Sequence, residues 1–259
     1  MRLPHRQICF RESDFLQTWQ EMSRVGSIFG SKRNRNRASD LLNLTASYVG
    51  GSLYSDGFSL FHNGGLPLIE RREGPMIEEI LLRPGRTILP DGSLPLRITL
   101  HLNHLGLQES RMRYWPSPTR APSVVASIDV GQLEIPTCWP IWLVSEDQTE
   151  KIDIVDWIQR LALPWFDLFR SEAELRRRLF QEKLPLVGLD TSLELVIAEF
   201  GALEGARFLD QCVLARPGMG ERIRSQTLRI MRAKEASKIG NSVEDNLSAV
   251  AASFRLINR

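Results

Sequence analysis

Apolar and polar residues follow two different periods along the chain. Between residues 94 and 103, five aliphatic side chains alternate with mainly polar ones and share one side of an extended segment. A period of two is typical of an antiparallel β-strand with one face on a core and the other in water. From Ile152 onward, apolar residues recur every three or four positions, which is typical of amphipathic helices. The pattern predicts a strand-rich first half and a helix-rich second half.

Further strands are predicted where apolar alternation is bounded by turn residues. Asp56-Gly57 and Asp91-Gly92 indicate tight turns, because Asp and Gly tolerate positive φ. The basic run KRNRNR at residues 32–37 is predicted as a loop. Segment 76–82 is compatible with a strand or with a helical turn. The other predicted strands are residues 42–48, 58–61, 66–70, 111–114, 124–135 and 141–144.

Helices are predicted where apolar residues recur at helical spacing. Ser171 and Glu174 match a capping box, in which each side chain accepts a hydrogen bond from the other's backbone N–H. Pro164 is expected to end the helix that starts at Ile152, because the residue before a proline avoids the α region. A bend or break is expected at Gly205. The predicted helices are residues 13–29, 152–162, 191–203, 206–215 and 221–238, one that starts at Ser171, and a weaker one at 243–257.

This order of elements predicts an α+β protein. The expected architecture is a twisted antiparallel sheet, a meander, flanked by helices and followed by a C-terminal helical extension. The predicted boundaries are an α+β domain at 1–183, a helical C-terminal unit at 184–239 and a weakly ordered tail at 240–259.

Composition places the chain among soluble globular proteins. Of its 259 residues, 42% are apolar and 25% are charged. Cys9, Cys138 and Cys212 are far apart and fit neither a zinc spacing nor a disulfide framework, so we expect packing residues in a reducing compartment. No signal-peptide pattern opens the chain, and no apolar run is long enough to span a membrane. We therefore expect a cytoplasmic protein of bacterial origin.

Positive charge is concentrated near the C-terminus. The net charge is only +2, so the whole molecule is not a polyanion binder by charge alone. Residues 216–238, however, hold seven Lys or Arg against two Glu. A run of this kind is typical of a solvated helix face, or of a surface that contacts nucleic acid or an acidic protein. The candidate contact residues are Arg222, Arg224, Arg229 and Arg232.

Motifs that carry catalysis are absent from the sequence. There is no GxSxG nucleophile elbow, HExxH, Walker loop or GxGxxG. His101 and His104 are three apart on a predicted strand, so they face opposite sides and do not bind one metal together. Paired carboxylates fall mainly at predicted helix starts, where they complement the helix dipole. We expect no metal and no cofactor, and the sequence favours a non-enzymatic protein.

Four of the six tryptophans lie between Trp139 and Leu179, where strands are expected to give way to helices. Aromatic residues at such a joint are typical of packing between helices and a sheet. Exposed aromatic side chains also make strong protein contacts. Any ring exposed among Trp165, Phe169 and Trp142 is therefore a candidate partner-binding residue.

The segments DGFSLF, PLRITLHLNHLG and IVDWIQRLALPWFDLFRSEAELRRRL occur here in that order. In this order the chain resembles a group of small bacterial α+β domains of unknown function, some of which are thought to act as immunity-like proteins in toxin gene neighbourhoods. The resemblance covers residues 14–180, rests on apolar structural motifs and supplies no catalytic residue. The helical extension after residue 184 departs from it.

The resemblance implies tight, non-enzymatic binding of another protein. We therefore expect a protein-binding protein, with neutralisation of a toxin as the implied role. The alternative is a nucleic-acid-binding or regulatory protein that uses the basic C-terminal helix. Neither function requires a membrane or a cofactor.

Overall fold

A computed structural model describes residues 7–11, 32–63, 66–85, 88–112, 123–147, 149–181, 184–214, 216–233 and 242–257. The chain divides into two compact units, and each is described by itself. Unit 1 comprises residues 1–102 and 127–167, and unit 2 comprises residues 103–126 and 168–259. Strands and helices together give an α+β protein, as predicted.

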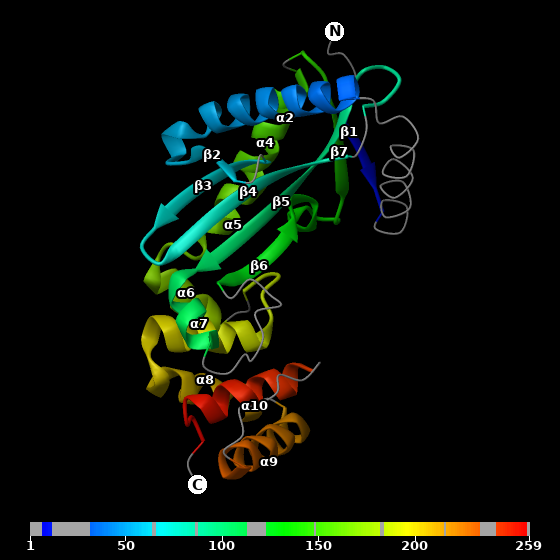
Figure 1. Ribbon diagram of the computed structural model, residues 1–259. Helices are drawn as coiled ribbons and strands as arrows, with labels where there is room; N and C mark the ends of the chain where they lie inside the picture. The colour runs from blue at the N-terminus through cyan, green and yellow to red at the C-terminus, as the bar shows by residue number, and fades with distance from the viewer. Residues whose placement is uncertain are drawn as a thin grey trace. The chain divides into compact units, whose positions relative to one another are not determined.

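Seven strands of the described residues form one sheet with the order β1-β7-β5-β4-β3-β2, and β6 pairs with β5 (Figure 1). The pairs β2–β3, β3–β4, β5–β7 and β1–β7 are antiparallel, and the first two form the expected meander. The predicted strands at 58–61, 66–70, 94–103 and 141–144 are confirmed, and segment 76–82, for which a strand and a helical turn were both open, is a strand. The strands are β1 (Gln7–Phe10), β2 (Ser59–Asn63), β3 (Leu66–Glu73), β4 (Met76–Pro84), β5 (Leu94–His104), β6 (Val124–Asp129) and β7 (Trp139–Val144).

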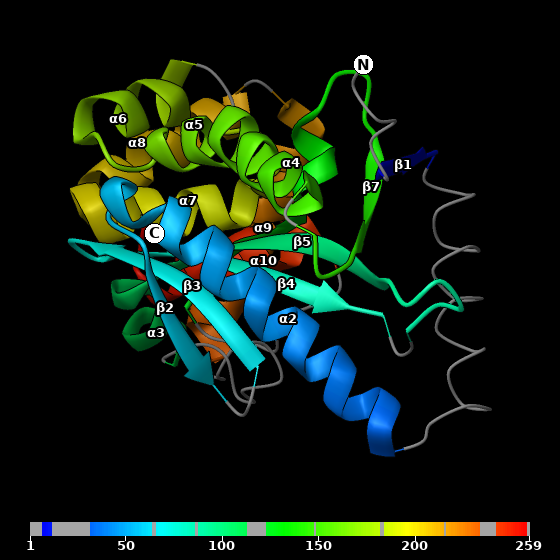
Figure 2. The same cartoon turned by 90° about the horizontal axis from the view of Figure 1, so that it is seen from above.

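Helix α2 (Lys32–Ser52) lies where the sequence predicted a basic loop and a strand at 42–48, so both predictions were wrong. A helical stripe of Leu42, Ala46 and Val49 is buried, whereas Leu44, which belongs to the alternating pattern, is 48% exposed. The helical period therefore places more apolar area in the core than the strand period does. In unit 1, α2 packs across β2, β3 and β4 (Figure 2).

The helical stretch after β7 continues through Pro164, contrary to prediction. It consists of α4 (Thr149–Trp157), a π-helical turn (Ile158–Ala162) and α5 (Leu163–Asp167). In the π turn, the N–H of Leu163 donates to the carbonyl of Ile158, five residues earlier. This wider turn changes the hydrogen-bond pattern just before Pro164, whose lack of an N–H is what ordinarily interrupts a helix.

Strand β6 ends six residues earlier than the predicted strand at 124–135. Asp129 caps a 3₁₀ turn (Val130–Leu133), because its carboxylate accepts from the N–H of Gly131 at 3.1 Å. The side chain of Gln132 in turn accepts from the N–H of Asp129 at 2.9 Å. This reciprocal cap satisfies backbone donors that a longer strand would pair with a neighbouring strand.

Unit 2 is mainly helical. Its helices are α3 (Leu105–Met112), α6 (Glu172–Gln181), α7 (Leu189–Phe200), α8 (Ala202–Leu214), α9 (Pro217–Ala233) and α10 (Val243–Ser253). Of the strand predicted at 111–114, the described residues 111–112 are helical, so that prediction was wrong. The break between α7 and α8 falls at Gly201, whose φ of 87° favours glycine, and not at Gly205.

Cysteine bonding differs from the prediction. Cys138 is disulfide-bonded, whereas Cys212 is not. The wide spacing along the chain suggested no disulfide framework, but the fold joins residues that are distant in sequence. The helix predicted at 13–29 lies outside the described residues. Within those residues, no helix is both long and apolar enough to cross a membrane.

Candidate partner-binding surface

The aromatic side chains predicted to contact a partner are buried. Trp142 is 0% exposed, and Trp165 and Phe169 are each 3% exposed. Trp142 donates from its indole N–H to a carboxylate oxygen of Asp153 at 2.9 Å, and its ring packs edge-on against Trp157 with centroids 5.5 Å apart. These rings lie in the core and form no contact surface, because packing and hydrogen bonding inside the fold already use them.

The four predicted arginines of α9 are exposed. Since a helix turns by about 100° per residue, Arg222, Arg229 and Arg232 fall within one side of α9, and Arg224 projects from another. We call the first three the cationic face. Of the four, only Arg222 forms a side-chain hydrogen bond or ion pair with another residue of the described chain, at 3.2 Å from Glu244. The cationic face is thus available to a partner.

Helix α10 holds α9 in place. Ile223 and Thr227 of α9 are 1% and 0% exposed, and the apolar side of α10 is buried as well. Ser242 caps α10 by accepting from the N–H of Asp245 at 3.1 Å. Asn246 donates to Asp190 at the start of α7 at 2.9 Å, so α10 is tied to two other helices of unit 2. The cationic face therefore lies on a helix that is held by packing against its neighbours.

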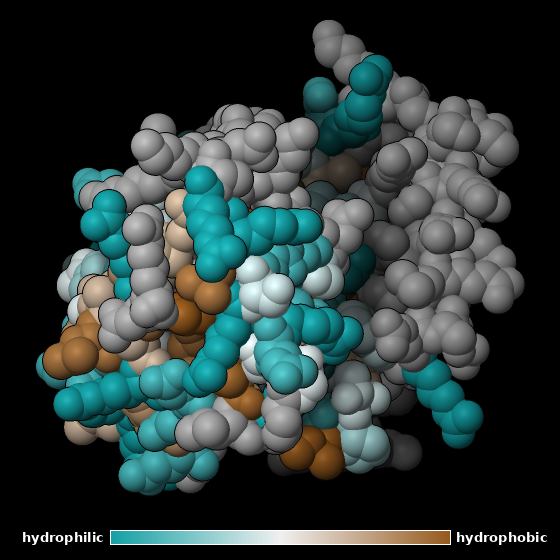
Figure 3. Space-filling view, turned by 90° about the horizontal axis from the view of Figure 1, so that it is seen from below, coloured by the Kyte–Doolittle hydropathy of each residue, from teal (hydrophilic) through white to brown (hydrophobic). Residues whose placement is uncertain are grey.

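Acidic groups lie next to the cationic face. The side chain of Gln226 donates to the carboxylate of Asp245 at 2.5 Å, and this hydrogen bond together with that from Ser242 lowers the pKa of Asp245. A shallow hollow of about 500 Å³ on α9 is lined by Glu221, Arg222, Ser225, Gln226 and Arg229. Figure 3 shows hydrophilic side chains over much of the described surface on its side of the molecule, with hydrophobic ones in separate patches. The candidate surface thus carries both signs of charge.

The sequence predicted a weak helix at 243–257, which contains the acids beside α9, but it did not predict that this helix packs against α9. Ser242 followed three residues later by Asp245 is an N-cap pattern, and it marks the true start of α10. This cap is the signal in the sequence that the segment predicted to be weakly ordered begins with a regular helix.

Two buried arginines pair with buried glutamates, one in each unit. In unit 1, Arg71 donates to Glu78 at 2.5 Å and to the carbonyl of Asp56 at 2.9 Å. In unit 2, Arg111 makes a bidentate contact with Glu194, the shortest distance being 2.5 Å. Mutual hydrogen bonding of this kind compensates for the loss of water around buried charges. Both pairs therefore have a structural role in the interior of their units.

A third ionic pair, in unit 1, has a more exposed arginine than the other two. Arg97 contacts Asp129 at 3.1 Å. Burial raises the pKa of Asp129, and the hydrogen bond from Gly131 and the positive charge of Arg97 oppose that rise. Since Asp129 also caps the 3₁₀ turn, its carboxylate has a structural role.

The two predicted histidine positions have separate carboxylate partners. His101 Nδ1 lies 3.4 Å from Glu79, and His104 Nε2 lies 2.5 Å from Glu199. Among the described residues, no group of three or more His, Cys, Asp or Glu side chains is arranged to hold a metal ion.

Comparisons with protein-family models, curated proteins and solved structures found no match to the chain. The resemblance to immunity-like bacterial domains therefore stays a prediction.

Proposed function

We propose that the protein is a non-enzymatic binding protein that recognises an acidic segment of another protein through the cationic face of α9. The observation that carries this proposal is the exposure of Arg222, Arg229 and Arg232 on a helix that is packed against α10. Arginine is enriched at protein interfaces, because its planar fork pairs with carboxylates through two hydrogen bonds. A fixed helix also spares the ordering cost that a flexible basic loop would incur on binding.

The mixed charge around the face favours a protein over nucleic acid. Glu221 lies in the same hollow as Arg222 and Arg229, and Glu244 contacts Arg222 at 3.2 Å. A phosphate backbone presents a continuous line of negative charge, which these carboxylates repel. A protein partner can instead place acids opposite the arginines and a cation opposite Glu221. Nucleic-acid binding is kept as an outcome of the test.

Toxin neutralisation remains the role that the family resemblance implies, and in that role the partner would be a toxin with an acidic surface. Inhibition by tight binding requires a complementary surface and no active site. The exposed arginines of α9 support binding of an acidic partner, whatever its identity.

The test is a pull-down from extract of the native host with the triple variant Arg222→Gln/Arg229→Gln/Arg232→Gln. We expect wild type to retain one stoichiometric partner and the triple variant to lose it. If each arginine contributes about tenfold, affinity falls by roughly a thousandfold. The matched control is Arg11→Gln/Arg35→Gln/Arg37→Gln, which removes three exposed arginines from unit 1.

A gel shift with duplex DNA separates the two classes of partner. We expect no retention at low salt. Retention that weakens by about 0.9 log units per phosphate contact for each log unit of salt would favour nucleic acid instead. Equal capture of a partner by the triple variant and by wild type would remove α9 from the interface.

A further inference from the structure

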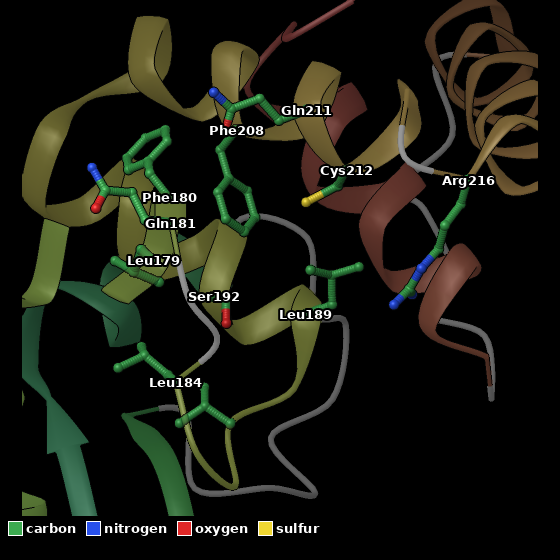
Figure 4. Close-up of a pocket in the computed structure, with 11 residues that line it drawn as sticks. Leu179, Phe180, Gln181, Leu184, Leu189, Ser192, Phe208, Gln211, Cys212 and Arg216 are labelled. Carbon is green, nitrogen blue, oxygen red and sulfur yellow. The ribbon is translucent and has the colours of Figure 1, made fainter. Parts of the chain in front are cut away.

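A second feature of unit 2, sharing no residue with the cationic face, is a cavity of about 560 Å³ bounded by α6, α7, α8 and the connector at 184–188 (Figure 4). Its volume lies within the range of sites that hold small molecules. Most of its lining is aliphatic or aromatic. The principal apolar lining residues are Leu179, Phe180, Leu184, Leu189 and Phe208.

The apolar walls are held by packing. Leu179, Leu184 and Phe208 are nearly fully buried, with 6%, 5% and 4% of their surface exposed. Phe180 packs edge-on against Phe208 with ring centroids 5.7 Å apart, and the guanidinium of Arg176 lies 5.4 Å from the Phe180 ring centre. Side chains that are already held by packing lose little conformational entropy when an apolar ligand binds against them.

Among the lining residues that the structure describes, Arg216 is the one that carries a charge, and it lies in the connector between α8 and α9. In Figure 4 Arg216 stands at one side of the lining, and Phe180 and Gln181 stand at the other. Arg216 is exposed and has no side-chain hydrogen bond or ion pair with any residue that the structure describes. Ser192 already donates its hydroxyl to the carbonyl of Gly188 at 2.9 Å. The lining therefore combines an apolar body with one cationic end.

We infer that this cavity binds an aliphatic carboxylate, with the alkyl chain against the apolar walls and the carboxylate paired with Arg216. An alkyl chain gains affinity for each methylene it removes from water. A guanidinium binds a carboxylate through two parallel hydrogen bonds, and no acidic side chain of the described lining competes for it. A neutral apolar ligand would leave Arg216 without this contact.

Calorimetric titration with sodium octanoate, sodium decanoate and 1-octanol tests the inference. Two further methylenes make decanoate bind roughly tenfold more tightly than octanoate. Octanol binds more weakly than octanoate, because it lacks the charge. Arg216→Gln weakens octanoate by roughly tenfold, and Arg216→Lys weakens it less, since the charge remains without the fork. The matched control is Arg35→Gln, which removes the same charge from an exposed position of unit 1, outside both the cavity and the cationic face.

Cys212 provides a second readout from the lining itself. Its thiol is not in a disulfide, so its alkylation by iodoacetamide is measurable by peptide mass spectrometry. Decanoate slows that alkylation in wild type. Val187→Trp, which adds bulk from the half-buried connector, abolishes both heat and protection while the helical circular dichroism is unchanged. Absence of binding by wild type, or unchanged binding in Arg216→Gln, overturns the inference.

Discussion

The Trp139–Leu179 segment and helix α9 are the two most distinctive stretches of the sequence, and the structure treats them in opposite ways. Trp142, Trp157 and Trp165 of the first are at most 8% exposed. The arginines of α9 stand in solvent, and Arg222 retains 70% of its side-chain exposure even with an ion pair to Glu244. Both stretches are rich in residues that dominate protein interfaces.

Residue type alone therefore does not identify an interface. A tryptophan is large and apolar, so it lowers the free energy of folding most when the fold itself removes it from water. An arginine loses its hydration when buried and needs a partner, so one without an internal partner stays outside. Exposure therefore separates the two stretches, and it indicates α9 as the contact surface.

The largest expected effect is on the buried side of this comparison. Trp142→Ala removes a fully buried ring and its hydrogen bond to Asp153, so it should lower the free energy of unfolding by about 3–5 kcal/mol. Chemical denaturation followed by near-ultraviolet circular dichroism measures this. Trp142→Phe keeps an aromatic ring and should cost less. A change below about 1 kcal/mol for Trp142→Ala would contradict a core role.

Much of the sheet was predictable, and the reason is visible in β5. Its alternate residues Leu96, Ile98, Leu100 and Leu102 are all 0% exposed, so a pattern of period two reports directly on burial. The same reasoning failed in α2. Residues 42–48 alternate by coincidence, and the segment is a helix because its helical stripe buries more apolar area. A local sequence pattern does not show whether the helical or the strand arrangement of its apolar residues will pack against the rest of the fold.

The candidate surface was predictable only in part. Exposure of Arg222, Arg224, Arg229 and Arg232 follows from their helical spacing around buried Ile223. The acids contributed by α10 and the cavity lined by Cys212 and Arg216 depend on which helices pack together. Such packing is set by tertiary contacts between residues far apart in sequence, and no single-sequence motif encodes it.

A smaller effect is expected on the exposed side. The triple variant Arg222→Gln/Arg229→Gln/Arg232→Gln should change the free energy of unfolding by less than about 1 kcal/mol, because exposed ion pairs contribute little. The measurement is the same denaturation experiment, run beside the pull-down. A large loss of stability would show that these arginines stabilise the fold, as the buried tryptophans do, and would contradict their assignment to a contact surface.

The third and smallest change in stability concerns the charged residues of the Trp139–Leu179 segment. It shows whether they contribute little to folding, as expected for the arginines of α9, or stabilise the fold, as the buried rings do. Glu174 accepts hydrogen bonds from Arg177 and Arg178 at 2.7 Å and 2.8 Å, and these lower its pKa from 4.5 to about 2. A carboxylate whose pKa is lower in the folded state stabilises that state above its unfolded pKa. This contribution is therefore complete above pH 4.5 and is lost as the pH falls towards 2.

Glu174→Gln should accordingly flatten the acid limb of stability between about pH 4.5 and about pH 2, and leave a small deficit at neutral pH. Denaturation midpoints across that range measure the slope, and added salt should reduce the difference from wild type, because exposed charges are screened. Glu172→Gln is the control in the same helical turn, since Glu172 is exposed and has no side-chain hydrogen bond or ion pair within the described residues. If both variants had the same acid limb, the cluster around Glu174 would contribute nothing beyond its location on the surface. A steeper difference that persists in salt would mean that the segment uses charge, as well as its rings, to hold the fold together.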